Sequence, residues 1–110
     1  MNYLVSVIIP TFNRSALLKR ANESVFSQTY KNWELIIIDN SSTDDSVMMA
    51  NKYNKKNIKV IKVNNQGIIA YSRNIGIKNA KGNVIAFLDS DDWWDSLKLE
   101  KCLIELDSHK

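Results

Sequence analysis

The sequence predicts a mainly parallel α/β sheet with helices on both faces. Short apolar runs alternate four times with stretches of helical period, as they do in chains built from β-α-β units. The first run, LVSVIIP, is almost entirely apolar, as expected for a strand covered on both faces. The chain has 110 residues, 45% hydrophobic and 25% charged, which is typical of one globular domain over residues 1–110.

Four strands are expected. Pro10 should end the first, because proline has no N–H to donate to a ladder. The third, IKVIKV, alternates apolar and basic residues, which favours a position nearer the sheet edge. The predicted strands are residues 4–10, 33–39, 58–63 and 83–89.

A helical pattern follows each strand. Ser15 is the expected N-cap of the first helix, and Asp95 that of the last. The capping-rich run NSSTDDS should open a second helix over residues 44–53, and a third follows Gly67 over residues 68–80. The last helix carries an apolar stripe in which the cysteine should be a small core residue: Leu99, Cys102, Leu103 and Leu106.

The composition argues against several classes of protein. The net charge of +3 is mild and no aromatic platform accompanies the basic residues, so no nucleic-acid partner is expected. A single cysteine excludes an internal disulfide and a cysteine-type zinc site. His109 should be an exposed tail residue. The clustered lysines should lie on a solvated helix end and strand edge: Lys52, Lys55, Lys56, Lys59 and Lys62.

The sequence contains no pattern of a leader peptide or a transmembrane segment. The start MNYLVSVIIP lacks a basic region and a small-residue cleavage site, and no apolar run reaches transmembrane length. We therefore expect the chain in the cytoplasm, with the inner face of the membrane as the alternative location.

Polar residues follow three of the predicted strands. Because ligands bind outside the carboxyl ends of open parallel sheets, these residues predict a cleft on one rim. They are Thr11, Phe12, Asn13 and Arg14 after the first strand, Asp39, Asn40, Ser41 and Ser42 after the second, and Asp89, Ser90, Asp91 and Asp92 after the fourth.

The last of these groups contains an Asp-x-Asp pair, Asp89 and Asp91. Magnesium-like cations take oxygen ligands and commonly bind one or two carboxylates together with substrate phosphates. Trp93 and Trp94 follow at once, either as part of the site or as a cover for the sheet edge. The pair therefore predicts a divalent-cation site.

These motifs together resemble the nucleotide-binding part of family 2 glycosyltransferases, which have the GT-A fold. Four segments carry the resemblance over about residues 5–106: VSVIIPTFNR, SVFSQTYKNWELIIIDNSSTDDS, NQGIIAYSRNIGIKNAKG and VIAFLDSDDWWDSLKLEK. The resemblance implies the strand order 3-2-1-4 and a nucleoside-diphosphate sugar donor, usually a UDP sugar. It also implies Mn²⁺ or Mg²⁺ on the diphosphate and inversion of the anomeric centre.

The resemblance assigns nucleotide-binding roles by position. Pro10, Thr11 and Phe12 would line the base pocket, with Phe12 stacking on the base. Asp39 and Asn40 would face the base and ribose. The family often has an aspartate where this chain has Asn40, and an amide both accepts and donates hydrogen bonds. Uracil is therefore expected, with other bases left open.

The resemblance assigns the remaining site residues in the same way. Arg73 matches an Ala-Arg-Asn element that supports the nucleotide, although Ser72 stands in place of the alanine. Asp89 and Asp91 would bind the metal, with Asp91 the direct ligand. The implied cofactor-binding set is Pro10, Thr11, Phe12, Asn13, Asp39, Asn40, Arg73, Asp89 and Ser90.

The expected function is therefore metal-assisted transfer of a sugar to a saccharide or glycoconjugate acceptor. The carboxylate base and the acceptor half are expected beyond residue 110. The chain alone should therefore bind the donor without transferring sugar, and should self-associate through its exposed last helix. One alternative is a non-catalytic nucleotide-sugar-binding fragment. A metal-dependent phosphoryl-transfer domain fits less well, because its Asp-x-Asp belongs on the first strand.

Overall fold

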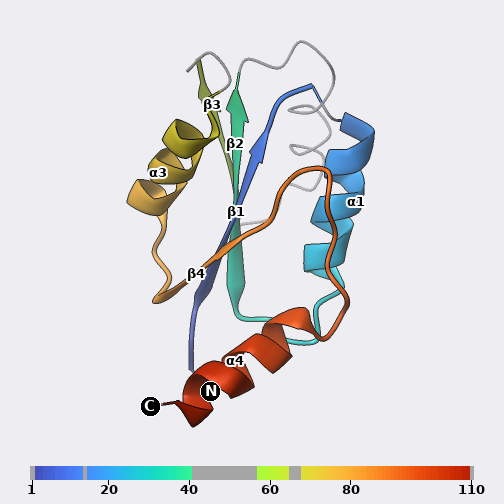
Figure 1. The fold of residues 1–110 in the computed structure, drawn as a ribbon, viewed down its shortest axis with the longest axis vertical. Helices are drawn as coiled ribbons and strands as arrows, with labels where there is room; N and C mark the ends of the chain where they lie inside the picture. Colours follow the sequence, from blue (N-terminus) through green and yellow to red (C-terminus); the bar gives the residue numbers. More distant parts are fainter. Residues whose placement is uncertain (1, 14, 41–56, 65–67, 110) are drawn as a thin grey trace.

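The computed structural model describes residues 2–13, 15–40, 57–64 and 68–109. They form a parallel sheet in the order β3-β2-β1-β4, which confirms the predicted order and fold class (Figure 1). Each strand lies within two residues of its predicted bounds. The strands are β1 (Val5–Thr11), β2 (Trp33–Asn40), β3 (Ile58–Val63) and β4 (Val84–Phe87), and the described helices are α1 (Ser15–Phe26), α3 (Ile69–Asn79) and α4 (Lys98–Ser108).

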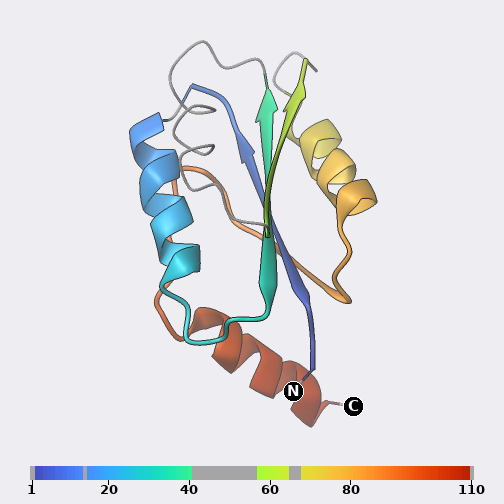
Figure 2. The ribbon, with the colours of Figure 1, turned by 180° about the vertical axis from the view of Figure 1, so that it is seen from behind.

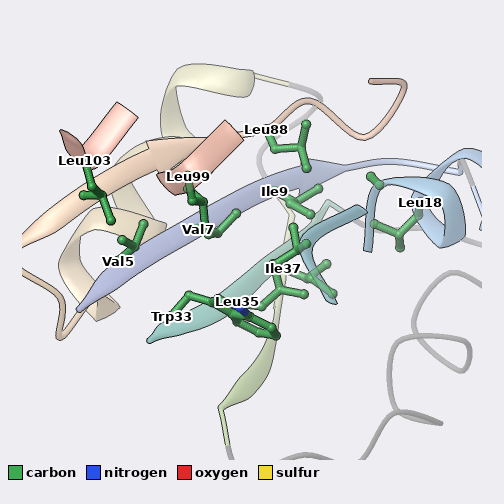
Figure 3. Close-up of a cluster of buried hydrophobic side chains, with 12 residues drawn as sticks. Val5, Val7, Ile9, Leu18, Trp33, Leu35, Ile37, Leu88, Leu99 and Leu103 are labelled. Carbon is green, nitrogen blue, oxygen red and sulfur yellow. The ribbon is translucent and has the colours of Figure 1, made fainter. Parts of the chain in front are cut away.

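Helices cover both faces of the sheet, as predicted. The two ribbon views show α1 and α4 on one face and α3 on the other (Figures 1 and 2). Side chains alternate between the two faces along a strand, so β1 and β2 contribute to a core on each side. The larger core lies under α1 and α4 (Figure 3) and contains Val5, Val7, Ile9, Leu18, Ala21, Val25, Trp33, Leu35, Ile37, Leu88, Leu99 and Leu103. The smaller core lies under α3 and contains Ile8, Ile36 and Ile38.

Pro10 does not end β1, contrary to the prediction. The strand runs on to Thr11, and Pro10 pairs in register with Ile38 of β2. The backbone of Pro10 faces β4 rather than β2, because the Leu88 N–H donates to the Ile8 carbonyl on that side. The missing N–H therefore interrupts only the ladder with β4, which ends at Phe87.

The last helix begins later than predicted and buries fewer residues. Asp95 is not its N-cap, since α4 begins at Lys98 after Leu97. The Asp95 carboxylate instead accepts a hydrogen bond from the Leu97 N–H (2.8 Å). Leu99 and Leu103 are buried in the core, but Cys102 is exposed, so the expectation of a core cysteine was wrong.

Among the described residues, two of the clustered lysines and the histidine are exposed, as predicted. Lys59 and Lys62 are exposed on β3, and His109 is exposed after α4. Within the described residues, no helix combines the length and apolar character needed to cross a bilayer.

Some predicted features lie outside the described residues. They are the helix over 44–53, the side chain of Ser15, and the residues Arg14, Ser41, Ser42, Lys52, Lys55, Lys56 and Gly67.

The close approach of α3 to β1 gives a test of the fold. A Cβ at Gly76 would lie 2.5 Å from Cγ2 of Ile8, which is fully buried. Gly76→Ala should therefore lower the free energy of unfolding in urea by about 1–3 kcal/mol. On an open helix face the same change would raise the free energy of unfolding by about 1 kcal/mol. Asn74→Ala, at an exposed position of α3, is the matched control. Stabilisation by Gly76→Ala would contradict the observed packing.

Candidate functional site

A pocket of about 250 Å³ lies at the carboxyl ends of β1 and β2. It is bounded by the end of β1, the end of β2, the first turns of α3 and the segment after β4. Its lining residues are Pro10, Thr11, Phe12, Asn40, Ile69, Ser72 and Ser90. The structure thus brings together five members of the cofactor-binding set. Ile69 and Ser72 were not predicted, and their only signal was their place at the start of the helix after Gly67.

Phe12 and Asn13 turn the chain from β1 toward α1. Phe12 is 52% exposed although it is a large apolar side chain, which leaves its ring open to a ligand in the pocket. Asn13 has φ = 48°, in the left-handed region that asparagine tolerates better than most residues. Asn13 is exposed and does not line the pocket, so its part in the site is to make this turn.

Asp39 is fully buried beside the pocket rather than in its lining. It pairs in register with Thr11, and alternation along β2 places it on the same face as Leu35 and Ile37. Among the described residues, neither its carboxylate oxygens nor Oγ1 of Thr11 has a hydrogen-bond partner. Buried polar groups nearly always have partners, so this pair is a strong candidate for contacts with a ligand.

Arg73 joins α3 to the segment after β4. Its Nη2 lies 3.2 Å from Oδ1 of Asp89, and its guanidinium lies 5.3 Å from the centre of the Phe87 ring. Both charged side chains are about half exposed, so the ion pair adds about 1 kcal/mol or less to stability. The larger effect of the ion pair is to orient Asp89, because Arg73 is itself positioned by the Phe87 ring.

Asp91 projects into solvent from a turn. The Asp92 N–H donates to the Asp89 carbonyl (3.0 Å), and the Asp91 carbonyl accepts from Nη2 of Arg20 (3.1 Å). In the part of the chain that the structure describes, the Asp91 carboxylate has no recorded partner. The Asp91 carboxylate is therefore open to a cation, whereas the Asp89 carboxylate is already paired with Arg73.

The donor chemistry of this turn fits a magnesium-like ion. Asp89 and Asp91 offer hard oxygen ligands on exposed side chains. The described residues contain no cluster of three or more histidines, cysteines, aspartates and glutamates that could enclose a metal on its own. A pair of carboxylates suits an ion that completes its shell with phosphate oxygens and water.

The two tryptophans have different surroundings. Trp94 is half-buried and packs against the larger core. This favours the alternative in which a tryptophan covers the sheet rather than forming part of the site. Trp93 is 55% exposed beside the acidic turn. It remains available to the site.

The comparisons with known proteins agree with this geometry. The family model described as glycosyl transferase family 2 matches residues 6–110, and the chain belongs to that family. It is 44% identical over 107 residues to the Escherichia coli UDP-Glc:alpha-D-GlcNAc-diphosphoundecaprenol beta-1,3-glucosyltransferase WfaP, covering 97% of this chain and 43% of that protein. It is 39% identical to TuaG of Bacillus subtilis, a putative teichuronic acid biosynthesis glycosyltransferase, covering 91% of this chain and 40% of that protein.

The solved structures confirm the GT-A fold. TarS 1-349 of S. aureus in complex with UDP superposes with a TM-score of 0.89 at 32% identity, covering 96% of this chain and 32% of that chain. TarS has also been solved in complex with UDP-GlcNAc. The chain thus spans less than half the length of these relatives.

The buried Asp39 gives a test that needs no ligand. Asp39→Asn should raise the free energy of unfolding by on the order of 1 kcal/mol, because an amide costs less to bury without partners than a carboxylate. Urea denaturation at neutral pH measures the change. Glu23→Gln removes an exposed carboxylate of α1 and should leave stability nearly unchanged. A loss of stability in Asp39→Asn would mean that the carboxylate makes a favourable contact.

Proposed function

We propose that this chain is the donor-binding part of a glycosyltransferase that uses a UDP sugar. The observation that carries the proposal is the pocket at the ends of β1 and β2, whose lining includes the exposed ring of Phe12 and Ser90, which lies between Asp89 and Asp91. WfaP is named for a UDP-Glc donor, and TarS has been solved with UDP and UDP-GlcNAc. A UDP sugar is therefore the donor that both the residues and the relatives favour.

The chain's own residues would bind the donor in three places. Phe12 stacks on the base, and Asn40 and Asp39 offer polar atoms to the base and ribose from opposite faces of β2. Arg73 stands next to the diphosphate position, where its positive charge favours the phosphates. The five members of the predicted binding set that line the pocket support this assignment.

A divalent cation held by Asp91 and Asp89 would neutralise charge on the departing diphosphate. The residues present fit Mn²⁺ or Mg²⁺ as ligands, with Asp91 the freer of the two carboxylates. Glycosyl transfer requires a charged diphosphate to leave. Through the cation, Asp89 and Asp91 would stabilise the charge on this leaving group.

We further propose that the transfer inverts the anomeric centre and that the attacking hydroxyl belongs to a saccharide or glycoconjugate. A carboxylate base would deprotonate this hydroxyl. The name of WfaP includes such a glycoconjugate, alpha-D-GlcNAc-diphosphoundecaprenol. By analogy, we place the protein in the cytoplasm at the inner face of the membrane.

Asp91→Ala should abolish the metal-dependent part of nucleotide binding. Titration calorimetry with UDP should show tighter binding in Mn²⁺ than in EDTA for the unmodified protein. The variant should show no difference between the two conditions, because it lacks the carboxylate that bridges to phosphate through the cation.

Uridine, which has no phosphates, is the control ligand and should bind both proteins equally. Asp107→Asn, which removes a carboxylate of α4, is the control variant. Equal loss of uridine binding in Asp91→Ala would mean that the pocket had collapsed, and metal-dependent binding that survives the substitution would contradict the assigned ligand.

Asn40→Asp should sharpen the preference for UDP over GDP and CDP. A carboxylate can only accept the uracil N–H, whereas an amide carries donors as well as an acceptor and so suits other bases too. The gain should be on the order of 1 kcal/mol, or about fivefold in relative affinity. Competition binding with the three diphosphates measures it, and unchanged relative affinities would show that residue 40 does not contact the base.

A further inference from the structure

Residues 88–97 connect β4 to α4 and carry both proposed metal ligands; they are called the acidic loop here. The loop contains no helix or strand, so no ladder of its own keeps it in place. Its first part, including Asp89, is held by Arg73 from the α3 side of the sheet. The rest crosses to the α1 side, where Figure 1 shows it passing alongside α1.

Gln28 fixes the far end of the acidic loop. It follows α1, is fully buried, and makes a bond through each polar atom of its amide. Its Nε2 donates to the carbonyls of Asp95 (2.7 Å) and Ser24 (2.9 Å), and its Oε1 accepts from the Leu99 N–H (2.9 Å). One side chain thereby ties the end of α1 to the end of the loop and to the first turn of α4.

Two neighbouring contacts extend this connection along the loop. The Thr29 N–H donates to the Ser96 carbonyl (2.9 Å). Arg20, on the exposed side of α1, donates to the carbonyl of Asp91 (3.1 Å). The backbone of the freer proposed metal ligand is thus bonded directly to α1.

A purely structural explanation accounts for only part of this arrangement. Leu99 and Leu103 already anchor α4 in the core, so the helix does not need Arg20 to stay in place. Arg20 lies on the surface, where one hydrogen bond adds little to the free energy of folding. Arg20 instead affects where the Asp91 carboxylate points. The aspartate side chain is short, so the position of its backbone determines which atoms the carboxylate can contact.

We propose that Arg20 and Gln28 are positioning residues, which hold the acidic loop so that Asp91 meets the cation on the donor diphosphate. This inference rests on the proposed function. Neither residue lines the pocket or offers a ligand to the metal. They act through the backbone: Arg20 at Asp91 itself, and Gln28 at Asp95 and Leu99.

The test measures UDP affinity in Mn²⁺ and in EDTA for the unmodified protein, Arg20→Met and Gln28→Met. The tightening by Mn²⁺ should fall about threefold to tenfold in Arg20→Met and about tenfold to a hundredfold in Gln28→Met. Affinity in EDTA should change less than about twofold, because neither substituted side chain lines the pocket. Lys19→Met, the neighbouring exposed cation of α1, should leave both affinities unchanged.

Hydrogen exchange provides a second measurement without ligand. Amides of residues 89–99 should exchange faster in both variants, with β1 and β2 unchanged. If Gln28→Met does not fold, Arg20→Met decides the matter, because it replaces an exposed side chain. A variant with lowered stability but an unchanged Mn²⁺ effect and unchanged loop exchange would overturn the proposal.

The failure of the proposed function would look different. In that case the unmodified protein would bind UDP no more tightly in Mn²⁺ than in EDTA. Faster exchange of the loop in the variants would then support the bracing of the acidic loop by α1, and unchanged exchange would overturn it as well.

Discussion

The early separation of β4 from β1 is the constraint on which the rim of the sheet depends. The ladder between the two strands ends at Ile8 and Phe87, while β1 continues to Thr11. Pro10 has no N–H with which to continue it toward the Leu88 carbonyl, so the chain after β4 is free to turn away. Pro10 and Ser90, on the two diverging segments, both line the pocket. A donor residue at position 10 would favour a longer ladder and a narrower gap.

Helices on both faces of the sheet contribute to the site. On one face, α3 supplies Ser72 and Ile69 to the pocket and Arg73 to Asp89. On the other, α1 and the turn after it hold the acidic loop. The carboxylates therefore sit between two helices that do not depend on each other for their packing, since each rests on its own core. This arrangement gives a short loop without helix or strand the fixed position that the proposed metal site requires.

The residues at the rim reduce stability in ways that a binding site explains. Asp39 is buried without partners among the described residues, and Phe12 and Ile69 expose large apolar surfaces. β2 itself follows ordinary rules, with Leu35 and Ile37 buried on one face and Ile36 and Ile38 on the other. Local departures of this kind at a strand rim are typical of functional sites in otherwise consistent structures.

The sequence by itself determined the strands, their order through the family resemblance, and the set of polar residues at the carboxyl ends. These follow from local pattern, because apolar runs and the residues that end them are read over a few positions. It did not reveal the burial of Asp39, the exposure of Cys102 or the contacts of Arg20 and Gln28. Gln28 and Leu99 are 71 residues apart, as are Arg20 and Asp91. Only the tertiary structure decides such contacts, because they form when β4 and α4 pack back beside β1 and α1, and no local period encodes that meeting.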